Sequence, residues 1–514
     1  MSDTITLKAP AAGTLNDLGN YLTDGFWEDN GFSRHSFNTS GSNVISVNLT
    51  GLTTAGQQLA RWAFQAWELV ANIDFQETAN SSADMRFQDH ASGAYSSSHN
   101  IIGGHTGYSI VNVSTSWINY YGTSIDSYSL QTYIHEIGHA LGLGHQGNYN
   151  GSATYGVNNT FTNDSWQLSV MSYFSQSENT QTDASFGWIL GPMMADVIAI
   201  QELYGAASGS SETAGNTVWG ANSNLGGALG NYFDSLTGPS SNYNGSDVAF
   251  TIYDQGGVDT IDLSPLTTAN RIDMRAGYFS DVAGLIGNVG IARGTVLENV
   301  IAGAGNDTIT GNAANNSIKL GSGSDLAVGG AGNDTMWGGS GADRLDGGDG
   351  FDRAQYSSAS AAVIVDLQYT TYNTGEATGD TFVSIENLHG SAYNDSLRGN
   401  GHGNTIWGWN GNDALHGRDG NDHLLGGAGN DTMWGGSGAD EFYFRQGGGA
   451  DVVQDFEDNL DTIVLAHPLL TAVAQSLSYA TQQGNDIVFD FGSGDTLTIQ
   501  NTLIAALDSD ILLI

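Results

Sequence analysis

The residues with the clearest potential for chemistry lie between His135 and His145. On a helix, residues four apart share a face, so His135 and His139 can bind one metal ion from successive turns, with Glu136 in reach of a water on that metal. A catalytic zinc ion needs three protein ligands and one open position. We expect Gly142 to end the helix so that the chain turns and His145 returns as the third ligand. The pattern predicts a zinc-dependent hydrolase.

The short His-Glu-x-x-His pattern has an alternative interpretation, a helix with two histidines on a polar face. The additional Gly142 and His145 argue against it. With 72 Gly and 12 His among 514 residues, both would occur at these offsets by chance with a probability of roughly 0.003. The extended pattern therefore favours a metal site.

A second motif, Ser-Val-Met-Ser-Tyr, occupies residues 169–173. An extended zinc motif followed by a Met-turn is typical of metzincins, and this Ser-x-Met-Ser-Tyr sequence resembles the serralysin branch. The resemblance implies that Met171 forms an apolar floor under the zinc. It also implies that Tyr173 either ligates the zinc or swings away to stabilise the oxyanion. Taken alone, Met171 could be a core residue and Tyr173 a packed aromatic side chain.

The composition is strongly acidic. The chain has 13 basic and 54 acidic residues, a net charge of −41, and only 13% charged residues in total. Nucleic acid is excluded as a partner because too few cations are available to neutralise phosphates. An excess of carboxylates in a glycine-rich chain indicates hard cations, calcium above all. The absence of cysteine leaves the redox compartment open, and we expect neither a Sec signal peptide nor a membrane span.

The second half of the chain repeats every nine residues. Acidic or amide residues recur at this interval in two blocks, and each is followed two positions later by a hydrophobic residue. The positions are Asp307, Asn316, Asp325, Asp334, Asp343 and Asp352, and then Asp395, Asn404, Asp413, Asp422, Asp431 and Asp440. This is the nonapeptide pattern of a calcium-binding parallel β-roll. A disordered Gly/Asp linker is the alternative, but it does not explain a strict register of both acidic and apolar positions.

Glycines permit left-handed turns, and the Asp side chains and turn carbonyls offer oxygens to calcium. The predicted calcium-binding positions in the repeats are Gly303, Gly305, Asp307, Gly321, Gly323, Asp325, Gly330, Gly332, Asp334, Gly339, Gly341, Asp343, Asp413, Asp422, Asp431 and Asp440. By resemblance to the first calcium turn of serralysins, Asp254, Gly256, Asp259 and Glu298 are further candidate ligands. Asn316 and Asn404 each remove a carboxylate, which puts the calcium sites near them in doubt.

The two blocks are separated by 43 positions between Asp352 and Asp395, which is not a multiple of nine. The chain therefore contains either two rolls or one interrupted stack, with a strand expected at residues 363–367. A typical serralysin has one compact block, so the second block is a departure from the resemblance.

We expect an α+β zincin (metzincin) protease domain followed by an all-β parallel β-roll. The predicted segments are a leader or pro-segment (1–20), the protease domain (21–205), a linker and junction (206–249), the roll (250–443, with blocks at about 303–356 and 393–442) and a C-terminal β segment (444–514). In the protease domain the periodicity predicts helices at 54–70, 128–142 and 193–204 and strands at 73–77, 85–88 and 110–113. Residues 93–108 resemble the edge strand that pairs with an extended substrate. His90, His99 and His105 are expected to be ordinary histidines.

These features together predict a secreted zinc metalloendopeptidase of protein and peptide substrates, folded by calcium and acting as an extracellular monomer. The end of the chain, residues 508–514, resembles the type I export signal of serralysins, although an ordinary final strand would have a similar sequence. Calcium outside the cell would then couple export to folding. Two other functions stay open: a calcium-dependent adhesion protein in which the zinc domain is vestigial, and a zinc enzyme that hydrolyses another bond.

Overall fold

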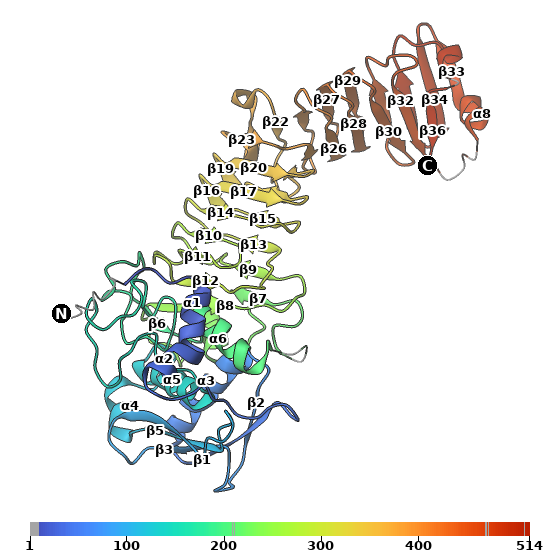
Figure 1. The fold of residues 1–514 in the computed structure, drawn as a ribbon. Coiled ribbons are helices and arrows are strands. Elements are labelled where there is room, and N and C mark those ends of the chain that lie inside the picture. The colour runs from blue at the N-terminus through green and yellow to red at the C-terminus, as the bar shows by residue number, and fades with distance from the viewer. Residues whose placement is uncertain (1–9, 208, 210, 468–469, 471, 508) are drawn as a thin grey trace, which may run out of the picture. The chain divides into compact units, whose positions relative to one another are not determined.

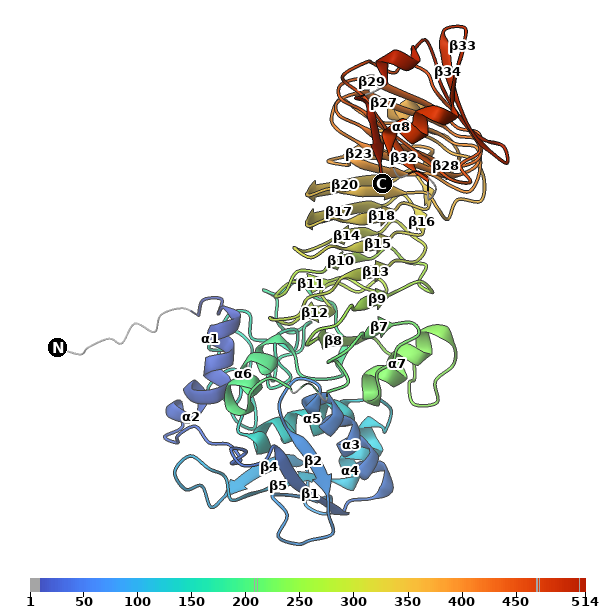
Figure 2. The ribbon, with the colours of Figure 1, turned by 90° about the vertical axis from the view of Figure 1, so that its right-hand side faces the viewer.

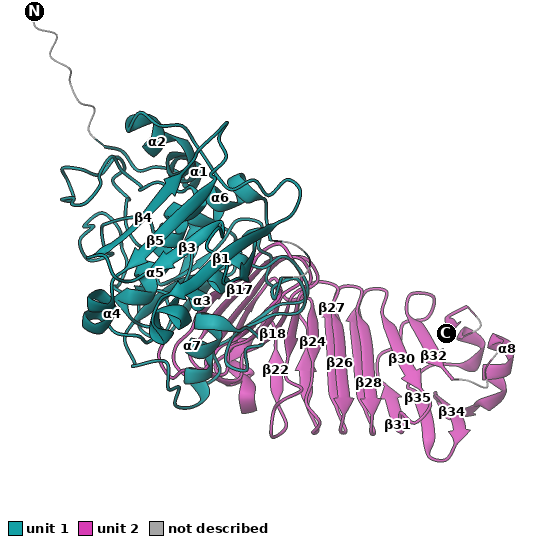
Figure 3. Ribbon diagram, turned by 90° about the horizontal axis from the view of Figure 1, so that it is seen from below, with its two compact units in different colours: residues 1–265, 270–297 teal, residues 266–269, 298–514 magenta. Residues whose placement is uncertain are grey.

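The computed structural model describes residues 10–514 apart from residues 208, 210, 468, 469, 471 and 508. The chain forms two compact units, Met1–Pro265 with Asn270–Leu297, and Leu266–Ala269 with Glu298–Ile514 (Figure 3). The first unit mixes helices and strands, and the second is built almost entirely of strands (Figure 1). The predicted order, an α+β unit followed by an all-β unit, is confirmed.

A five-stranded sheet in the order β2-β1-β3-β5-β4 forms one layer of the first unit. Its strands are β1 (Val44–Gly51), β2 (Asp74–Glu77), β3 (Met85–Gln88), β4 (Ala94–His99) and β5 (Tyr108–Val113). Ile45, Val47 and Leu49 alternate along β1 and are buried, which is the period-two pattern of a strand with one face in the core. Only β4 is antiparallel to its neighbour, and it lies at the edge of the sheet, where the edge strand is expected.

Two helices, α3 (Thr54–Glu68) and α5 (Tyr128–Leu141), pack against each other, and α5 also contacts β4 and β5. The hydroxyls of Thr53 and Ser127 accept hydrogen bonds from backbone N–H groups in the first turns and so cap the helices. Leu59, Ala63 and Trp67 of α3 share one buried face. The indole N–H of Trp67 donates to the carbonyl of Ile134 at 3.1 Å, which fixes α3 to α5.

The described chain begins with a run of short helices, α1 (Leu15–Asn20), the π-helix η1 (Tyr21–Gly25) and α2 (Phe26–Asp29). In α1, Leu18 is fully buried, and α1 packs along α6 (Met194–Tyr204), as Figures 1 and 2 show. The leader predicted over residues 1–20 overlaps this helix, so its last residues belong to the folded unit. Residues 1–9 of the predicted leader lie outside the described residues.

The first unit extends past the boundary expected at residue 205. It also contains α4 (Thr115–Tyr121), β6 (Trp188–Ile189), β7 (Val218–Gly220), α7 (Gly227–Thr237), β8 (Val248–Ile252), β9 (Thr260–Asp262), β10 (Arg271–Asp273), β11 (Phe279–Ser280) and β12 (Val289–Ile291). The segment expected as a linker therefore includes a helix. Leu229 and Phe233 lie four residues apart on α7 and are both buried, and α7 contacts α3.

The second unit is a parallel roll whose short strands stack in ladders (Figure 2). The longest ladder runs through β13 (Asn299–Ile301), β15 (Ser317–Lys319), β18 (Thr335–Trp337), β21 (Arg353–Gln355), β24 (Asn387–His389), β26 (Thr405–Asn410), β28 (His423–Ala428), β30 (Glu441–Arg445), β32 (Thr462–Ala466) and β36 (Ile511–Leu513). The predicted inward positions are buried in it, and Ile318 pairs with Met336, which in turn pairs with Ala354.

The opposite side of the roll changes ladder between the two blocks. One ladder contains β14 (Thr308–Thr310), β17 (Leu326–Ala331), β20 (Arg344–Asp349) and β23 (Thr381–Val383), and a small pair is formed by β16 (Ser322–Gly323) and β19 (Ser340–Gly341). The other contains β22 (Ile364–Asp366), β25 (Ser396–Arg398), β27 (Ala414–Asp419), β29 (Thr432–Ser437), β31 (Ala450–Val453), β35 (Asp495–Ile499), β34 (Asp486–Gly492) and β33 (Ala480–Gln483).

Of the two arrangements left open by the sequence, the structure has one interrupted stack. In the continuous ladder Ala354 pairs with Leu388, which pairs with Ile406, so the stack bridges the 43-position gap. The predicted strand at residues 363–367 is β22. At the end of the chain, β36 pairs with β32, with Ile511 opposite Ile463. Among the helices that the structure describes, none has the length and apolarity to cross a membrane.

Candidate metal centre and catalytic cleft

Helix α5 carries the first two predicted ligands, His135 and His139, on successive turns. It ends at Gly142, whose backbone is left-handed with φ 110°. A Cβ at this position would lie 2.0 Å from the carbonyl oxygen of His35, so both the conformation and the space require glycine. The turn after Gly142 brings His145 back to the helix, as predicted.

The three imidazoles converge on one point. The Nε2 atom of His139 lies 3.1 Å from that of His135 and 2.9 Å from that of His145. Within the described part of the chain, this is the one group of three or more His, Cys, Asp or Glu residues whose ligand atoms converge in this way. The structure therefore brings the three sequence-predicted ligands together.

Each ring is oriented by a backbone carbonyl. The Nδ1 atoms of the three histidines each lie 2.8 Å from a carbonyl oxygen, and the pairs are His135 with Val170, His139 with Leu143, and His145 with Tyr149. A carbonyl oxygen can only accept, so each Nδ1 carries the proton and each Nε2 presents a lone pair. This is the tautomer that a metal ligand requires.

Burial keeps these rings neutral. It lowers the pKa of His135 to about 4 and that of His139 to about 3, and it lowers the pKa of His145 well below its ordinary value. The lone pair of His139 lies about 3 Å from each of the other two, and all three lie within 4.8 Å of one another, so they repel unless a cation lies between them, and protons are disfavoured here. The donor set therefore fits a divalent metal ion, and three histidines leave a fourth position open as in catalytic zinc sites.

Glu136 lies beside this centre and is 7% exposed. Burial raises the pKa of its carboxyl group to about 8. A cation held by the neighbouring histidines would oppose this shift and favour the carboxylate. Glu136 is therefore placed and poised to accept a proton near neutral pH.

The Met-turn lies under the centre. Met171 is fully buried, and its sulfur would lie 2.6 Å from a Cβ placed on Gly138 of α5. The ring centroids of Tyr173 and His145 lie 4.4 Å apart, and the hydroxyl of Tyr173 accepts a hydrogen bond from the N–H of Gly151 at 3.3 Å. Both residues therefore lie next to the centre, and the roles that the resemblance implies for them stay predictions.

The sequence did not reveal two buried carboxylates that support the site. Asp196 accepts hydrogen bonds from the N–H of Val170 at 2.7 Å and from the hydroxyl of Ser169, and so orders the turn whose carbonyl holds His135. Asp164 accepts from the hydroxyl of Tyr149 at 3.0 Å, next to the carbonyl that holds His145. Their partners are distant in the sequence. The one available signal is the place of Asp196 in the first turn of α6.

A cleft of about 310 Å³ lies over the metal centre. It is lined by Phe26, Trp27, Phe32 and His35 from the N-terminal segment, by Ala94, Tyr95, Ser96, Ser97, Ser98 and Ile101 from β4 and the residues after it, and by Glu136, His139, His145, Asn150 and Tyr173. The edge strand β4 thus forms one wall of the cleft. The side chain of His99 stacks on Tyr108.

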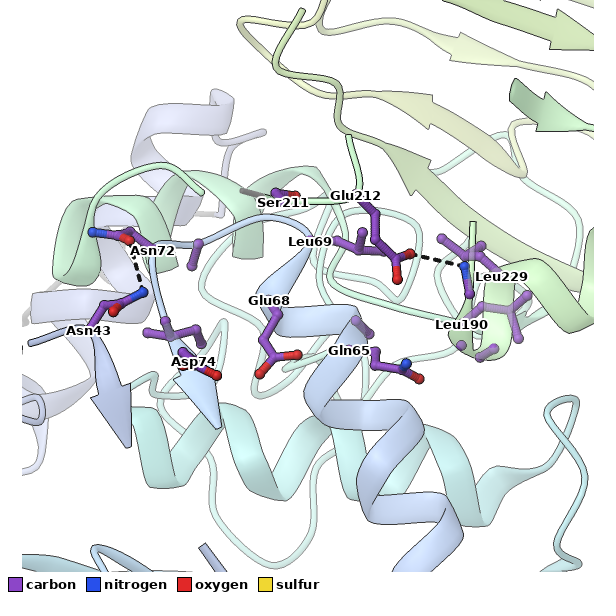
Figure 4. A pocket seen from close by; sticks show the side chains of 16 residues that line it. Asn43, Gln65, Glu68, Leu69, Asn72, Asp74, Leu190, Ser211, Glu212 and Leu229 are labelled. Carbon is purple, nitrogen blue, oxygen red and sulfur yellow. Dashed lines mark hydrogen bonds between the residues drawn. The ribbon is translucent and has the colours of Figure 1, made fainter. Parts of the chain in front are cut away.

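A second cavity, of about 340 Å³, lies elsewhere in the first unit (Figure 4). Its wall contains the carboxylates of Glu68, Asp74 and Glu212, and burial raises the pKa of Glu68. Glu68 accepts a hydrogen bond from the N–H of Phe75 and Glu212 accepts one from that of Gly226. None of the three histidines lines this cavity, so it is separate from the metal centre.

The predicted calcium ligands fall in both units. Asp254, Gly256 and Asp259 lie in the first unit, where Asp254 accepts from the N–H of Gly256 and from the indole of Trp219. Glu298 belongs to the second unit. The predicted aspartates of the repeats lie between the strands of the roll, whereas Gly323, Gly330 and Gly341 lie in β16, β17 and β19. Positive φ is found at Gly305, Gly321, Gly323, Gly330, Gly332, Gly339 and Gly341.

The aspartates of the roll share one geometry. In most repeats the backbone N–H donates to the Oδ1 atom of the residue two repeats later, for example from Asp325 to Asp343 at 2.9 Å, whereas the N–H groups of Asp343 and Asp431 donate to Asp380 and Asp451 at other spacings. The Oδ2 atom is buried and has no hydrogen-bond partner among the described residues at Asp325, Asp334, Asp343, Asp352, Asp413, Asp422, Asp431 and Asp440. A buried carboxylate oxygen without a donor is costly. These eight positions therefore fit a hard cation such as calcium.

Comparison with known proteins finds one family model and several relatives. The family described as Peptidase M10 serralysin C terminal matches residues 209–510. The chain is 39% identical over 267 residues to a metallopeptidase AprA of Pseudomonas marginalis, and this match covers 50% of this chain and 54% of that protein. It is 34% identical over 328 residues to serralysin B of Dickeya chrysanthemi (58% and 65% covered) and 41% identical over 344 residues to a serralysin C of the same organism (59% and 66% covered). These matches span between about half and two thirds of the relatives' lengths.

Proposed function

Because the chain belongs to the serralysin family of metalloproteases, we propose that it is a secreted zinc-dependent endopeptidase whose roll binds calcium. The observation that carries the proposal is the convergence of the Nε2 atoms of His135, His139 and His145 with Glu136 beside them. Zinc is the metal that best fits three neutral imidazoles with an open position. The substrates are proteins and peptides, and the edge strand β4 offers its backbone to an extended chain.

Zinc held by three imidazoles supplies Lewis-acid chemistry, because it polarises a carbonyl group and makes water a better nucleophile. Glu136 takes the proton from the attacking water and passes it to the leaving amine. The hydroxyl of Tyr173 donates to the oxygen that becomes negatively charged, after it leaves the N–H of Gly151. The carbonyls of Val170, Leu143 and Tyr149 keep the rings in the reactive tautomer throughout.

In this proposal calcium enters the turns of the roll at the buried Oδ2 atoms. The chain leaves the producing cell unfolded, by the type I route that the resemblance of its last residues implies. It then folds where calcium is abundant, because ion binding is coupled to folding. The acidic repeats repel one another without the ion, which keeps the protease inactive inside the cell.

The test is cleavage of casein by the purified chain, with zinc and calcium withdrawn separately, and by a Glu136→Ala variant. We expect the variant to bind zinc and calcium like the original chain and to lose cleavage by several orders of magnitude, because it lacks the general base. A variant with near-native turnover would remove Glu136 from the mechanism. A chain that folds with calcium and cleaves nothing would favour the adhesion alternative.

A further inference from the structure

The turn that carries His145 is held by residues 22–35, which we call the N-terminal strap. The N–H of Gly144 donates to the carbonyl of Leu22 at 2.7 Å. The indole N–H of Trp27 donates to the carbonyl of Gly142 at 2.9 Å. Two of the three backbone units before the third ligand are thus hydrogen-bonded to the strap.

The strap also packs closely on the same turn. A Cβ on Gly144 would lie 2.3 Å from the ring of Phe26, and the edge of that ring meets the imidazole of His145 with centroids 5.2 Å apart. The carbonyl of His35 lies against Gly142 from the far end of the strap. The position of His145 therefore depends on contacts from a segment more than a hundred residues earlier.

The strap is itself anchored to α6. The N–H of Phe37, just after the strap, donates to the hydroxyl of Tyr204 at 3.0 Å, and that hydroxyl donates to the carbonyl of Leu141 at 2.7 Å. The guanidinium of Arg34 donates to the carboxylate of Glu202 and to its backbone carbonyl, the latter at 3.0 Å. The strap is thus tied to the fold on both sides of the turn.

We infer that Trp27 is a positioning residue for the third metal ligand, acting through the carbonyl of Gly142, with Phe26 setting the orientation of the His145 ring. This inference rests on the proposed zinc site. Outer contacts of this kind orient metal ligands, and their loss commonly weakens metal binding by about 10–100-fold.

The test compares zinc binding by the full chain and by Trp27→Phe, which keeps an aromatic ring and removes the N–H donor. The dissociation constant and dissociation rate for zinc are measured by competition with a chromogenic chelator at constant calcium. The matched control is Trp117→Phe, because the Trp117 indole also donates one hydrogen bond, at 3.1 Å, but to Thr132 and away from the turn. We expect Trp27→Phe to release zinc about ten times faster and the control to be unchanged.

The visible spectrum of the chain with cobalt in place of zinc reports directly on the geometry of the metal ligands. It would not change if Trp27 only stabilised the fold. We expect a shifted visible spectrum in Trp27→Phe and in Phe26→Leu, and an unchanged one in Trp117→Phe. Native zinc affinity, release rate and cobalt spectrum in folded Trp27→Phe would overturn the inference. Should Trp27→Phe fail to fold, Phe26→Leu decides by the same measurements. A parent chain that binds no zinc would instead refute the proposed function.

A different observation concerns the part of the roll between the two blocks, residues 353–404, which we call the junction. Two of its acidic residues accept the same backbone hydrogen bond as the repeat aspartates, although they do not fall at the nine-residue spacing. The N–H of Asp343 donates to Asp380, and that of Asp352 donates to Glu386. Val363 likewise donates to Asp395 at 2.8 Å. The junction therefore has the same geometry as the blocks although the nine-residue spacing is lost.

In the junction, however, protein groups occupy the second oxygen. The Oδ2 atom of Asp380 accepts from the hydroxyl of buried Tyr356 at 2.7 Å. That of Asp395 accepts from the N–H of Ser391 at 2.6 Å. Asn404 has an amide nitrogen in place of Oδ2, and it donates to the carbonyl of Glu386 at 3.1 Å.

A partly buried cation, Arg418, contacts the junction from the neighbouring block. Arg418 lies in β27, where it pairs with Gly436 of β29, and its backbone is left-handed with φ 88°. Its guanidinium forms a two-point ion pair with Asp366 and donates to the carbonyl of Gly399 at 2.6 Å. An arginine thus supplies the positive charge next to the turn that contains Asn404.

We propose that the junction needs no calcium and divides the roll into two separate calcium-binding runs, Asp325 to Asp352 and Asp413 to Asp440. The proposal rests on calcium binding by the open aspartates. Tyr356, Ser391, Asn404 and Arg418 provide in the junction what the ion provides in the runs. The junction is then a folded core from which the two runs order when calcium arrives.

The test counts bound calcium by equilibrium dialysis and calorimetry in the full chain and in Asn404→Asp, which restores a carboxylate. We expect about one further calcium ion per chain in the variant. The control is Asn394→Asp, an exposed residue of the same roll outside the acidic positions, which adds the same charge and no ion. Tyr356→Phe is expected to make the exchange of amide hydrogens in β23 calcium-dependent, because Asp380, which directly precedes this strand, loses its donor.

An unchanged calcium count in folded Asn404→Asp would overturn the proposal. So would a junction in the parent chain that exchanges its amide hydrogens as fast as the two runs once calcium is withdrawn. A parent chain that binds no calcium at all would refute the calcium part of the proposed function itself.

Discussion

The histidine centre and the roll both fit metal ions, but they are built in opposite ways. At the centre each imidazole is already oriented by a carbonyl, and burial keeps it neutral, so the protein alone orients the ligands. In the roll eight buried carboxylate oxygens have no donor among the described residues. Under the proposed function, the metal used for chemistry enters ligands that the protein has already oriented, whereas the metal used for folding replaces missing hydrogen bonds.

The largest expected effect is the difference between withdrawing the two metals. Withdrawal of calcium should destabilise the roll and lower its β signal in far-UV circular dichroism, because the unpaired carboxylates repel and cannot be satisfied. Withdrawal of zinc with a chelator that spares calcium should abolish casein cleavage and leave the circular dichroism spectrum unchanged. A chain that keeps its roll without calcium, or loses the first unit without zinc, would break the comparison.

The second effect is the pH dependence of the calcium-free chain. Burial raises the pKa of Asp413 to about 8, those of Asp325, Asp343 and Asp422 to about 7, and those of Asp334 and Asp431 to about 6. In the unfolded chain these groups ionise near pH 4. The folded state thus binds more protons, and its stability is present below about pH 4 and is lost as the pH rises towards 8.

Thermal unfolding of calcium-free chain, prepared by passage over a chelating resin, checks this sign. We expect a higher midpoint at pH 5 than at pH 8 without calcium, and a much smaller difference with the ion bound. A calcium-free midpoint that stays constant or rises with pH would contradict the burial argument.

The sequence predicted those parts of the site whose geometry follows from local spacing. His135, Glu136, His139 and His145 could be placed because a helix and a glycine turn fix their relations. The repeat aspartates could be placed because nine residues make one half-turn of the roll. Both patterns depend on neighbours in the sequence.

The missed residues act over long separations. Trp27 contacts Gly142 over 115 positions and Asp196 contacts Val170 over 26, and neither pair shares a motif. Asp380 joins the aspartate ladder after a spacing of 37, so a search at a period of nine passes over it. The place of Asp380 in the ladder follows only from the pairing of β20 with β23, in which Phe382 lies opposite Leu345. This pairing restores the strand register after the residues that separate the two blocks.

A third and smaller effect concerns the support of His135. In Asp196 one carboxylate oxygen accepts hydrogen bonds from the backbone N–H groups of Val170 and Met193. In Asp196→Asn an amide N–H₂ group takes the place of this oxygen and cannot accept them. We therefore expect the backbone at Val170, and with it the carbonyl that orients His135, to shift. We expect casein cleavage to fall about 10–100-fold, with weaker zinc binding. Asp183→Asn, an exposed change in the same unit, is the control. Full activity with native zinc affinity in Asp196→Asn would show that the centre does not depend on this carboxylate.

The smallest effect should have opposite signs with and without calcium. Asn404 shows that the roll accepts an amide at an aspartate position when the nitrogen can donate to the carbonyl two repeats earlier. Asp422 has the same place two repeats later, and its Oδ2 atom lacks a donor. In Asp422→Asn the new N–H₂ group removes an unsatisfied buried acceptor, so without calcium the folded roll should gain about 1 kcal/mol. With calcium the same change should lower the affinity for the ion, because a charged ligand is lost.

Urea unfolding of the original chain and of Asp422→Asn, each with and without calcium, measures both changes in stability. If the variant is less stable in both conditions, the buried Oδ2 atom without a donor is not what makes the roll depend on calcium.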